Sequence, residues 1–248
     1  GGPARAARRP ARRPPRPPAH PVTALRHDPD REEAELREHL GDAYDHARLV
    51  RWQEQLEEEA RALGDEQRLY RESEAYLYNL TAFAMTGTKL PYLREILRIA
   101  PRGARLLDVG CGIGSDGLML LEAGYTVAFA DFDNPSTRYL RWRLAQRGLE
   151  APVHDLDREP LPSGFDLAYA FDVLEHVDDP LELLDAMEAA ARLVCVNVLD
   201  TSEEESVLHR ELPVDAIAAR ARSRGLWADR RFHGGRSRLL LYAASYDS

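Results

Sequence analysis

The sequence predicts an α/β fold in which a mainly parallel sheet follows a run of helices. After residue 101, short β-forming runs alternate with helical segments of about 10 to 15 residues, the spacing of parallel βαβ units. Before residue 101, apolar residues recur at helical spacing with no strand between them. A glycine-rich turn joins the first predicted strand to the next helix. These patterns favour a sheet domain that binds a ligand at the carboxyl ends of its strands.

The composition limits the classes of protein to which the chain can belong. Its 248 residues, 44% of them hydrophobic, suit one large domain or one domain with a cap. No apolar run approaches the roughly 18 to 20 residues of a membrane-spanning helix, so we expect no membrane insertion. The formal net charge of -9 argues against nucleic acid as the main partner, because an acidic surface repels phosphate.

Cysteine and lysine are both scarce. The two cysteines, Cys111 and Cys195, are too few for a disulfide scaffold and predict a reducing, cytoplasmic compartment. Lys89 is the only lysine, although Lys and Arg together number 33. No physical requirement of folding excludes lysine to this extent. We therefore interpret the bias as the coding preference of a GC-rich, bacterial genome.

Residues 1–27 are rich in arginine and proline and contain no acid. Proline blocks helix formation, and the segment has too few apolar side chains to build a core. We predict a disordered basic tail, with a basic arm that touches a membrane or RNA as the alternative. Because the tail holds positive charge, the rest of the chain is more acidic than the overall charge indicates.

Residues 28–100 are predicted to form a helical cap. Apolar side chains recur there at helical spacing between charged ones, as at Leu36, Leu40, Tyr44, Trp52 and Leu56. A homodimer through these helices stays open, although the apolar pattern does not persist over several heptads. Residues 76–97 are the most apolar and aromatic part of the cap and are expected to form core or the wall of a pocket.

Residues 101–248 are predicted to form the sheet domain. The expected parallel strands lie at residues 105–110, 126–131, 165–171 and 192–199. The helical segments between them lie at residues 115–124, 136–148 and 180–190. The last two β-type runs, 226–232 and 237–244, are joined by HGGR, which is typical of a hairpin and predicts an antiparallel edge strand.

The glycine-rich turn reads LLDVGCGIGSDG over residues 106–117. Gly112, Gly114 and Gly117 match GxGxxG, the dinucleotide-binding pattern, and Asp131 follows at about the expected distance. Asp108, however, ends the first strand, where its charge would repel a pyrophosphate and attract an ammonium group. A purely structural turn is the remaining alternative. The turn alone therefore leaves NAD open but favours a cofactor that carries an ammonium group.

Four motifs follow the cap in a fixed order: DVGCGIG, TVAFADFD, VHDLDREPLPSGFD and FDVLEHV. In this order and spacing they resemble the class I S-adenosylmethionine (SAM)-dependent methyltransferase family, over roughly residues 88–245. The resemblance implies a Rossmann-like, mostly parallel seven-stranded sheet with an antiparallel edge strand. It also implies SAM as the cofactor and methyl transfer as the reaction.

The resemblance assigns the cofactor-binding residues position by position. The methionine part of SAM would be held by Asp108 and by the backbone of Gly110, Cys111, Gly112 and Gly114. Asp131 would accept both ribose hydroxyls, which suits a carboxylate with two acceptor oxygens. The adenine would contact Phe132, Asp155 and Leu156. The reactive methyl group would lie near Phe171 and Asp172.

The chemistry asks little of the protein beyond alignment of the reactants and exclusion of water, because the sulfonium carries its own activation. If the acceptor must lose a proton, the candidate catalytic bases are Glu175, His176 and His209, with an ordinary structural role as the alternative for each. Three cap tyrosines are expected either to close over the site or to pack in the core: Tyr70, Tyr76 and Tyr78. No metal is expected, since the sequence has neither HExxH nor a CxxC pair.

The expected function is methyl transfer from SAM to a small-molecule acceptor, with neither nucleic acid nor membrane as partner. The GC-rich origin favours an acceptor from bacterial specialised metabolism. Three alternatives stay open: aminopropyl transfer, NAD-dependent redox chemistry, and a non-catalytic SAM-binding partner subunit. Whether oxygen, nitrogen or carbon receives the methyl group is open as well.

Overall fold

The computed structural model describes residues 25–64, 66–199 and 212–244. The predicted basic tail, apart from its last three residues, lies outside the described residues, and so does the candidate base His209. Among the described helices, none combines the length and the apolar character that crossing a bilayer requires.

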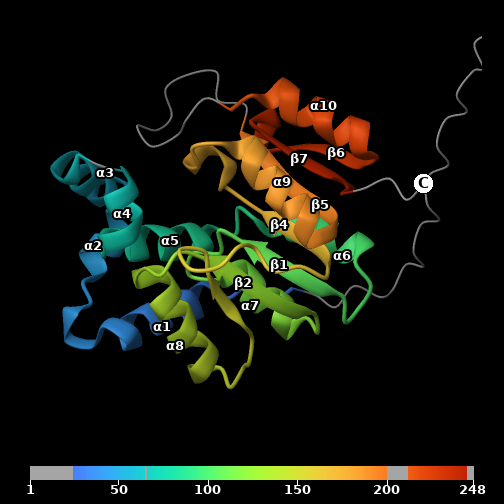
Figure 1. Ribbon diagram of the computed structural model, residues 1–248. Helices are drawn as coiled ribbons and strands as arrows, with labels where there is room; N and C mark the ends of the chain where they lie inside the picture. The colour runs from blue at the N-terminus through green and yellow to red at the C-terminus, as the bar shows by residue number, and fades with distance from the viewer. Residues whose placement is uncertain (1–24, 65, 200–211, 245–248) are drawn as a thin grey trace, which may run out of the picture.

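Seven strands form one sheet in the order β3-β2-β1-β4-β5-β7-β6 (Figure 1). The strands are β1 Arg105–Val109, β2 Thr126–Asp131, β3 Val153–Asp155, β4 Phe165–Ala170, β5 Ala191–Leu199, β6 Leu226–Phe232 and β7 Ser237–Ala243. Strands β1 to β5 pair in parallel, and β7 pairs antiparallel with both β5 and β6. The predicted α/β fold with its mostly parallel seven-stranded sheet is confirmed. The antiparallel strand β7 lies one place in from the edge, which β6 occupies.

Six helices precede the sheet and four lie between or beside its strands, within the described ranges. The first six are α1 Pro29–Leu40, α2 His46–Val50, α3 Trp52–Leu63, α4 Glu66–Glu72, α5 Ala75–Thr86 and α6 Leu90–Ile99. The others are α7 Ser115–Glu122, α8 Pro135–Gln146, α9 Pro180–Ala190 and α10 Val214–Arg224. Short 3-10 turns are η1 Gly41–Ala43, η2 Leu174–His176 and η3 His233–Gly235.

Local sequence explains where these helices begin. Asp28 accepts a hydrogen bond from the backbone N–H of Arg31 at the start of α1, and Asp179 accepts two in the first turn of α9. Proline follows both acids at the first helical position, where its missing N–H costs nothing. Asn134 and Thr137 form a reciprocal capping box at the start of α8. This start places α8 directly after the carboxyl end of β2.

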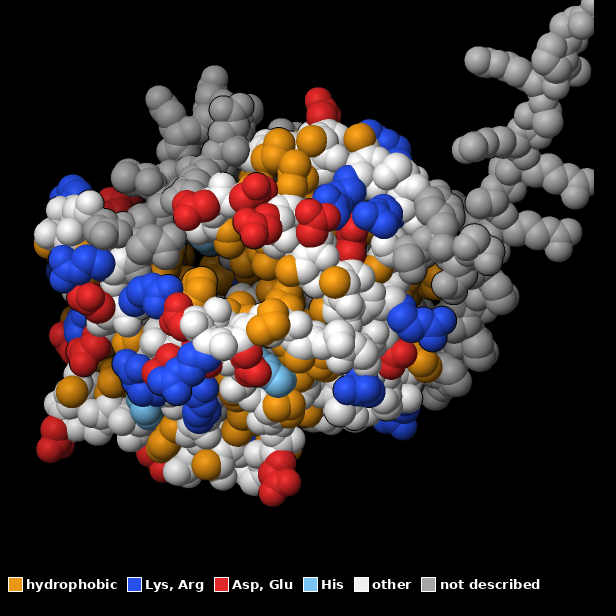
Figure 2. Space-filling model, in the orientation of Figure 1, with side chains coloured by type: hydrophobic (Ala, Val, Ile, Leu, Met, Phe, Trp, Pro, Cys, Tyr) orange, Lys and Arg blue, Asp and Glu red, His pale blue; other side chains and the backbone are white. Residues whose placement is uncertain are grey.

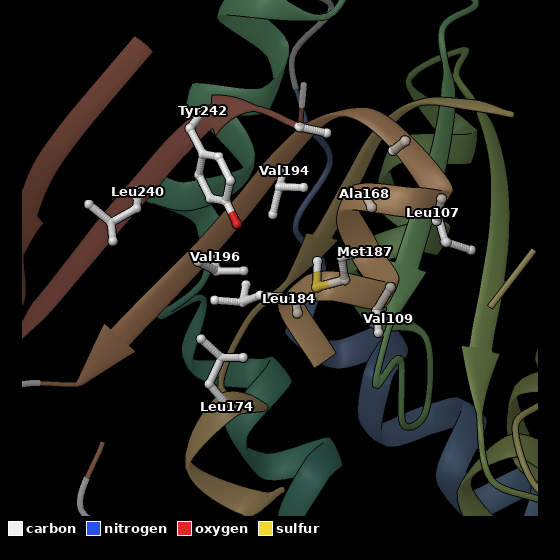
Figure 3. Packing of buried hydrophobic residues seen from close by; sticks show 14 of the residues in the cluster. Leu107, Val109, Ala168, Leu174, Leu184, Met187, Val194, Val196, Leu240 and Tyr242 are labelled. Carbon is white, nitrogen blue, oxygen red and sulfur yellow. The ribbon is translucent and has the colours of Figure 1, made fainter. Parts of the chain in front are cut away.

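Each face of the sheet buries its own apolar cluster. On one face, Leu184 and Met187 of α9 pack against Val194 and Val196 of β5 (Figure 3). On the other face, α6, α7 and α8 cover Leu106, Val127 and Leu167 among others. Helix α6, which the sequence places in the cap, thus packs in the core of the sheet. The domain division at residue 100 stays a prediction.

A third apolar cluster joins the cap to the sheet domain. It contains Leu36 of α1 and Leu77 of α5, together with Ile113 from the glycine-rich turn and Tyr139 from α8. Helices α3 and α4 lie at the end of the molecule opposite β6 and β7 (Figure 1). The cap therefore reaches the sheet next to the predicted cofactor turn.

Candidate functional site

The predicted site residues that the structure describes, which are all except His209, gather at the carboxyl ends of β1, β2, β3 and β4. Strands β1 and β4 are neighbours, while β2 and β3 extend the sheet in the other direction, so the strand order reverses between β1 and β4. Ligands of open parallel sheets bind at such a reversal, outside the carboxyl ends of the strands. The sequence thus placed the candidate site where this topology favours binding.

The turn after β1 requires glycine at specific positions. Gly110 and Gly114 have φ values of 67° and 73°, which favour glycine. A Cβ atom at Gly110 would lie 2.7 Å from a methyl of Val173, and one at Gly114 would collide with Leu140. The turn therefore brings bare backbone to the ends of the strands, as binding of a ligand by backbone groups requires.

Asp131 is fixed in place by this turn. Its Oδ2 atom accepts a hydrogen bond from the backbone N–H of Gly112 at 2.7 Å, and its Oδ1 atom accepts one from the N–H of Phe132 at 2.7 Å. Burial raises the pKa of Asp131 from its ordinary value, although the two backbone donors oppose the shift. The carboxylate is held with acceptor capacity left over, because each oxygen has two acceptor sites.

Asp155 lies beside Asp131 in the register of β2 and β3. One oxygen of Asp155 accepts a hydrogen bond from the N–H of Asp157 at 3.0 Å, and the other lies 3.1 Å from Nε of Arg158. The backbone N–H of Leu156 donates to the carbonyl of Asp131. Asp155 therefore stabilises its own turn, and its predicted contact with adenine stays a prediction.

Arg71 of α4 reaches the same place, which the sequence did not predict. Its guanidinium makes two hydrogen bonds of 2.8 Å to the carboxylate of Asp157. Its Cζ atom lies 4.6 Å from the centre of the Phe132 ring. Arg71 thus covers the aromatic face that the resemblance assigns to adenine.

Lys89, the only lysine, lies at the centre of an acidic cluster. Its Nζ donates to the carbonyl oxygen of Phe171 at 2.9 Å and lies 3.7 Å from carboxylate oxygens of Asp116 and Asp172. Burial lowers the pKa of Lys89, but the carboxylates of Asp116, Asp172 and Asp108 outweigh it and raise the pKa. The ammonium therefore stays charged.

The acidic cluster has unused acceptor atoms. Asp108 is 4% exposed, and burial, followed by the charge of Asp116, raises its pKa well above the ordinary value. Among the described residues, no group hydrogen-bonds to Oδ2 of Asp108, Oδ2 of Asp172 or either carboxylate oxygen of Glu175. Buried polar atoms are rarely left without a partner, so these oxygens suit a cationic ligand. SAM brings an ammonium, a sulfonium and a carboxylate, which match the cluster and Lys89.

Asp172 adopts a strained backbone conformation after β4, with φ at 56°. Asn197 of β5 holds it there: its side-chain oxygen accepts from the N–H of Asp172 at 2.7 Å, and its amide donates to Oδ1 at 2.6 Å. The ring of Phe171 is buried against Tyr92 and Tyr169. Phe171 therefore offers its backbone carbonyl to the site, whereas Asp172 offers a carboxylate oxygen.

The two described candidate bases have different surroundings. Glu175 is 1% exposed, and burial, followed by the charge of Asp172, raises its pKa from 4.5 to about 7. His176 shares a hydrogen bond of 2.9 Å between its Nδ1 atom and the hydroxyl of Tyr70. Glu175 is therefore placed to exchange a proton near neutral pH.

The three cap tyrosines separate into two environments. The rings of Tyr70 and Tyr76 lie 5.1 Å apart, and the Tyr70 ring lies 5.5 Å from that of His176. Tyr78 is buried in the cap, where its hydroxyl accepts a hydrogen bond from the N–H of Asp45. Tyr70 lies beside the candidate base His176 with Tyr76 next to it, so closure of these two over the site stays a prediction, whereas Tyr78 packs in the core.

The surface over the site is hollowed. Figure 2 shows hydrophobic side chains around a depression between α4 and the segment that leads into α9. Lys89 and Asp116 also border a cavity of about 60 Å³ between α1, α5 and α7. None of the predicted cofactor-binding residues lines this cavity, and its volume is below the roughly 300 Å³ of a usual small-molecule pocket.

Two further groups bear on the chemistry. Cys111 is a free thiol, and burial raises its pKa well above the ordinary value, which makes a thiolate nucleophile unfavourable. In the described parts of the chain, no three His, Cys, Asp or Glu side chains are grouped as ligands for a metal ion.

Residues 85–237 match the family model described as a methyltransferase domain. A ubiquinone biosynthesis O-methyltransferase of Xylella fastidiosa strain M23 is 32% identical over 108 residues, which are 42% of this chain and 43% of that protein. The chain thus spans less than half the length of the curated relatives that it matches.

Two solved structures show a similar fold. The mitomycin 7-O-methyltransferase MmcR matches with a TM-score of 0.56 and 21% identity, over 87% of this chain and 73% of that one. An O-methyltransferase family protein from Burkholderia thailandensis matches with a TM-score of 0.59 and 16% identity, over 84% of this chain and 74% of that one.

Proposed function

The chain belongs to the class I SAM-dependent methyltransferase family, and from this premise we propose that it transfers the methyl group of SAM to an oxygen atom of a small organic acceptor. The observation that carries the proposal is the acidic cluster around Lys89 at the carboxyl ends of the strands. A pyrophosphate would meet these carboxylates unfavourably, whereas the ammonium and sulfonium of SAM would be stabilised by them.

We assign the cofactor contacts from the geometry of the site. Lys89 would bind the carboxylate of the methionine part, and Asp108 and Asp172 would face its cationic groups. Asp131 has acceptor capacity left for the ribose hydroxyls, because two backbone donors already orient it. Phe132 would contact the adenine once Arg71 moves aside.

The reaction needs an aligned acceptor and a place for its proton. When bound, SAM supplies a methyl carbon made electrophilic by the sulfonium. Glu175, with its pKa raised to about 7, would take the proton of an acceptor hydroxyl as the new oxygen–carbon bond forms. The electron pair of the breaking sulfur–carbon bond stays with sulfur. His176 and Tyr70 would orient the acceptor through their shared hydrogen bond.

The choice of oxygen is supported by the relatives. Both the curated relative and the solved structures described above are named as O-methyltransferases. The apolar hollow in Figure 2 suits an organic acceptor better than a highly charged one. The arginine-rich composition adds the narrower proposal that the acceptor comes from bacterial specialised metabolism.

Calorimetric titration tests the cofactor and turnover tests the acceptor. The purified chain should bind S-adenosylhomocysteine (SAH), and it should bind NAD weakly or not at all. Incubation with methyl-labelled SAM and a panel of phenols, amines and carbon acids should label the phenols. Binding of NAD but not SAH would overturn the proposal, and release of methylthioadenosine would indicate aminopropyl-type transfer. SAH binding with no labelled acceptor would favour a non-catalytic partner subunit.

Compartment and assembly are part of the same proposal. Cys111 and Cys195 are both free thiols, which suits a reducing cytoplasm. A homodimer would use the cap, where α3 buries no residue and Val50 of α2 is 65% exposed. Light scattering during gel filtration distinguishes a 28.0 kDa monomer from a dimer.

A further inference from the structure

A buried network of charged side chains lies directly behind the glycine-rich turn. At its centre is Arg143 of α8, which is 0% exposed. Its Nη2 atom donates to Glu32 at 2.6 Å and its Nε atom to Glu35 at 2.7 Å, both on α1. Arg147 adds two hydrogen bonds to Glu35. The guanidinium groups and carboxylates therefore join the first helix of the cap to α8.

The same network reaches the turn itself. Nη1 of Arg143 donates to the carbonyl oxygen of Ile113 at 2.9 Å and to Oγ of Ser115 at 2.8 Å. Oγ of Ser115 in turn donates to Oε2 of Glu32 at 2.7 Å. The last residues of the turn are thus bonded both to α8 and to the cap.

A second observation ties the turn to the cap. The side chain of Ile113 is 3% exposed and belongs to the apolar cluster of the cap, with Leu36 of α1 and Leu77 of α5. Ile113 stands between Gly112, which donates to Asp131, and Gly114, the N-cap residue directly before α7. A shift of Ile113 would therefore move the donor that orients the ribose ligand.

We propose that Glu32 and Arg143 are positioning residues for SAM, which act by holding the turn 110–114 in the shape that orients Asp131. The inference rests on the proposed cofactor site. It makes the cap a contributor to cofactor affinity, since Glu32 belongs to α1. Removing one partner of a buried ion pair leaves the other charge buried without compensation, which is strongly destabilising. The position of the turn should therefore respond to small changes in this network.

Three conservative variants test the proposal. Ser115→Ala removes the bridging hydroxyl, Arg143→Lys removes the forked geometry of the guanidinium, and Glu32→Gln removes a charge and keeps the shape. Each should raise the dissociation constant of SAH about fivefold, the effect of one lost hydrogen bond. The KM for SAM should rise with it, while the KM for the acceptor stays within about twofold. Ser115→Ala combined with Glu32→Gln should lose less binding free energy for SAH than the sum of the losses in the two single variants.

The control is Arg220→Lys, the same change in another ion network. Arg220 of α10 binds Glu188 of α9 at 2.6 Å and lies far along the chain from the turn. Arg220→Lys should lower the melting temperature without changing the affinity for SAH.

The outcomes separate this inference from the proposed function. Wild-type SAH affinity in Ser115→Ala and Glu32→Gln would overturn the inference, whatever their melting temperatures. If Arg143→Lys does not fold, these two variants decide. If instead Asp131→Ala binds SAH like the wild type, the cofactor site itself is wrongly assigned, and the network has no turn to position.

Discussion

The contacts of Asp131 allow a test of whether it binds the ribose directly or only contributes negative charge. Its two backbone hydrogen bonds orient the carboxylate. Asp131→Ala should raise the dissociation constant of SAH at least about tenfold, because the ribose hydroxyls lose a charged acceptor. Titration calorimetry measures the change. The dissociation constant of Asp131→Asn should lie between those of Asp131→Ala and the wild type.

Asp133 provides the matched control for this test. It stands two residues further on, with a side chain that is 45% exposed and paired with Arg141. Asp133→Ala removes the same charge and should leave SAH binding within about twofold. Equal losses in the Asp131 and Asp133 variants would mean that net charge, and not a ribose contact, determines affinity.

Lys89 allows a test at the level of one functional group of the ligand. Lys89→Met should weaken SAH binding about tenfold, because the methionine carboxylate loses its cation. It should leave methylthioadenosine, which has no carboxylate, almost unaffected. Competition titrations of both ligands measure the difference. An equal loss for the two would show that Lys89 only balances Asp116 and Asp172.

Glu175 should give the protein a characteristic pH dependence. Its pKa is raised from 4.5 to about 7 by burial, so the folded state prefers the protonated acid. This preference contributes stability below about pH 4.5, and the contribution is lost as the pH rises towards 7. The melting temperature of Glu175→Gln, minus that of the wild type, should therefore increase as the pH rises from about 5 to 8.

The activity of the same variant tests its role as a base. The kcat of the wild type should rise with pH around 7, and Glu175→Gln should lose that rise along with most of its activity. Asp108 also has a raised pKa and affects stability in the same direction, but it remains in both proteins. A variant that keeps the pH profile of the wild type would assign the proton transfer elsewhere.

At the scale of elements, α4 joins the cap to both ends of the candidate site. Arg71 bonds to Asp157 beside Phe132, and Tyr70 bonds to His176. The Arg71 ion pair is partly exposed, so Arg71→Ala should change the melting temperature little. It should instead speed release of SAH several-fold, since the side chain over Phe132 is gone. Stopped-flow displacement measures this rate.

Arg68 provides a control on the same helix, because its carboxylate partner Glu72 is also on α4. Arg68→Ala should leave the release rate unchanged. Exchanging the charges, with Arg71→Asp and Asp157→Arg together, should restore part of the slow release. If Arg71→Ala and Arg68→Ala release SAH at one rate, α4 does not cover the cofactor.

The elements that sequence predicts well are those with a local pattern. The strands β1, β2, β4 and β5 alternate with amphipathic helices, and the structure confirms them. Strand β3 has three residues, too few to show a period. An apolar stripe does not reveal which core a helix faces, so the sequence places α6 in the cap although it packs against the sheet.

The site divides in the same way. The glycine turn directly follows β1 and Asp131 ends β2, so the positions of both can be predicted from the spacing of the strands in the sequence. Lys89 and Arg71 meet partners more than 80 residues away, so no local pattern could place them. The sequence marks Lys89 only as the single lysine, and a coding bias accounts for that without indicating its role.

For the whole molecule, binding of the cofactor should appear as stability. The cap and the sheet domain meet at the turn, so a ligand there binds the folded chain and not the unfolded one. SAH at about 100 times its dissociation constant should add about 2.7 kcal/mol. For a chain of this size that corresponds to a rise of about 5 to 10 °C in melting temperature. Thermal unfolding with SAH, NAD and no ligand measures it, and a rise with NAD alone would contradict the assignment.

The single lysine also makes the protein easy to observe. Growth on isotope-labelled lysine would place a label at one position of the whole chain, the partly buried Lys89 side chain whose ammonium donates to the carbonyl oxygen of Phe171. Its magnetic resonance signals need no assignment, because one residue gives them all. Titrations with cofactor, product or acceptor would then each be followed from inside the site, in the unaltered protein.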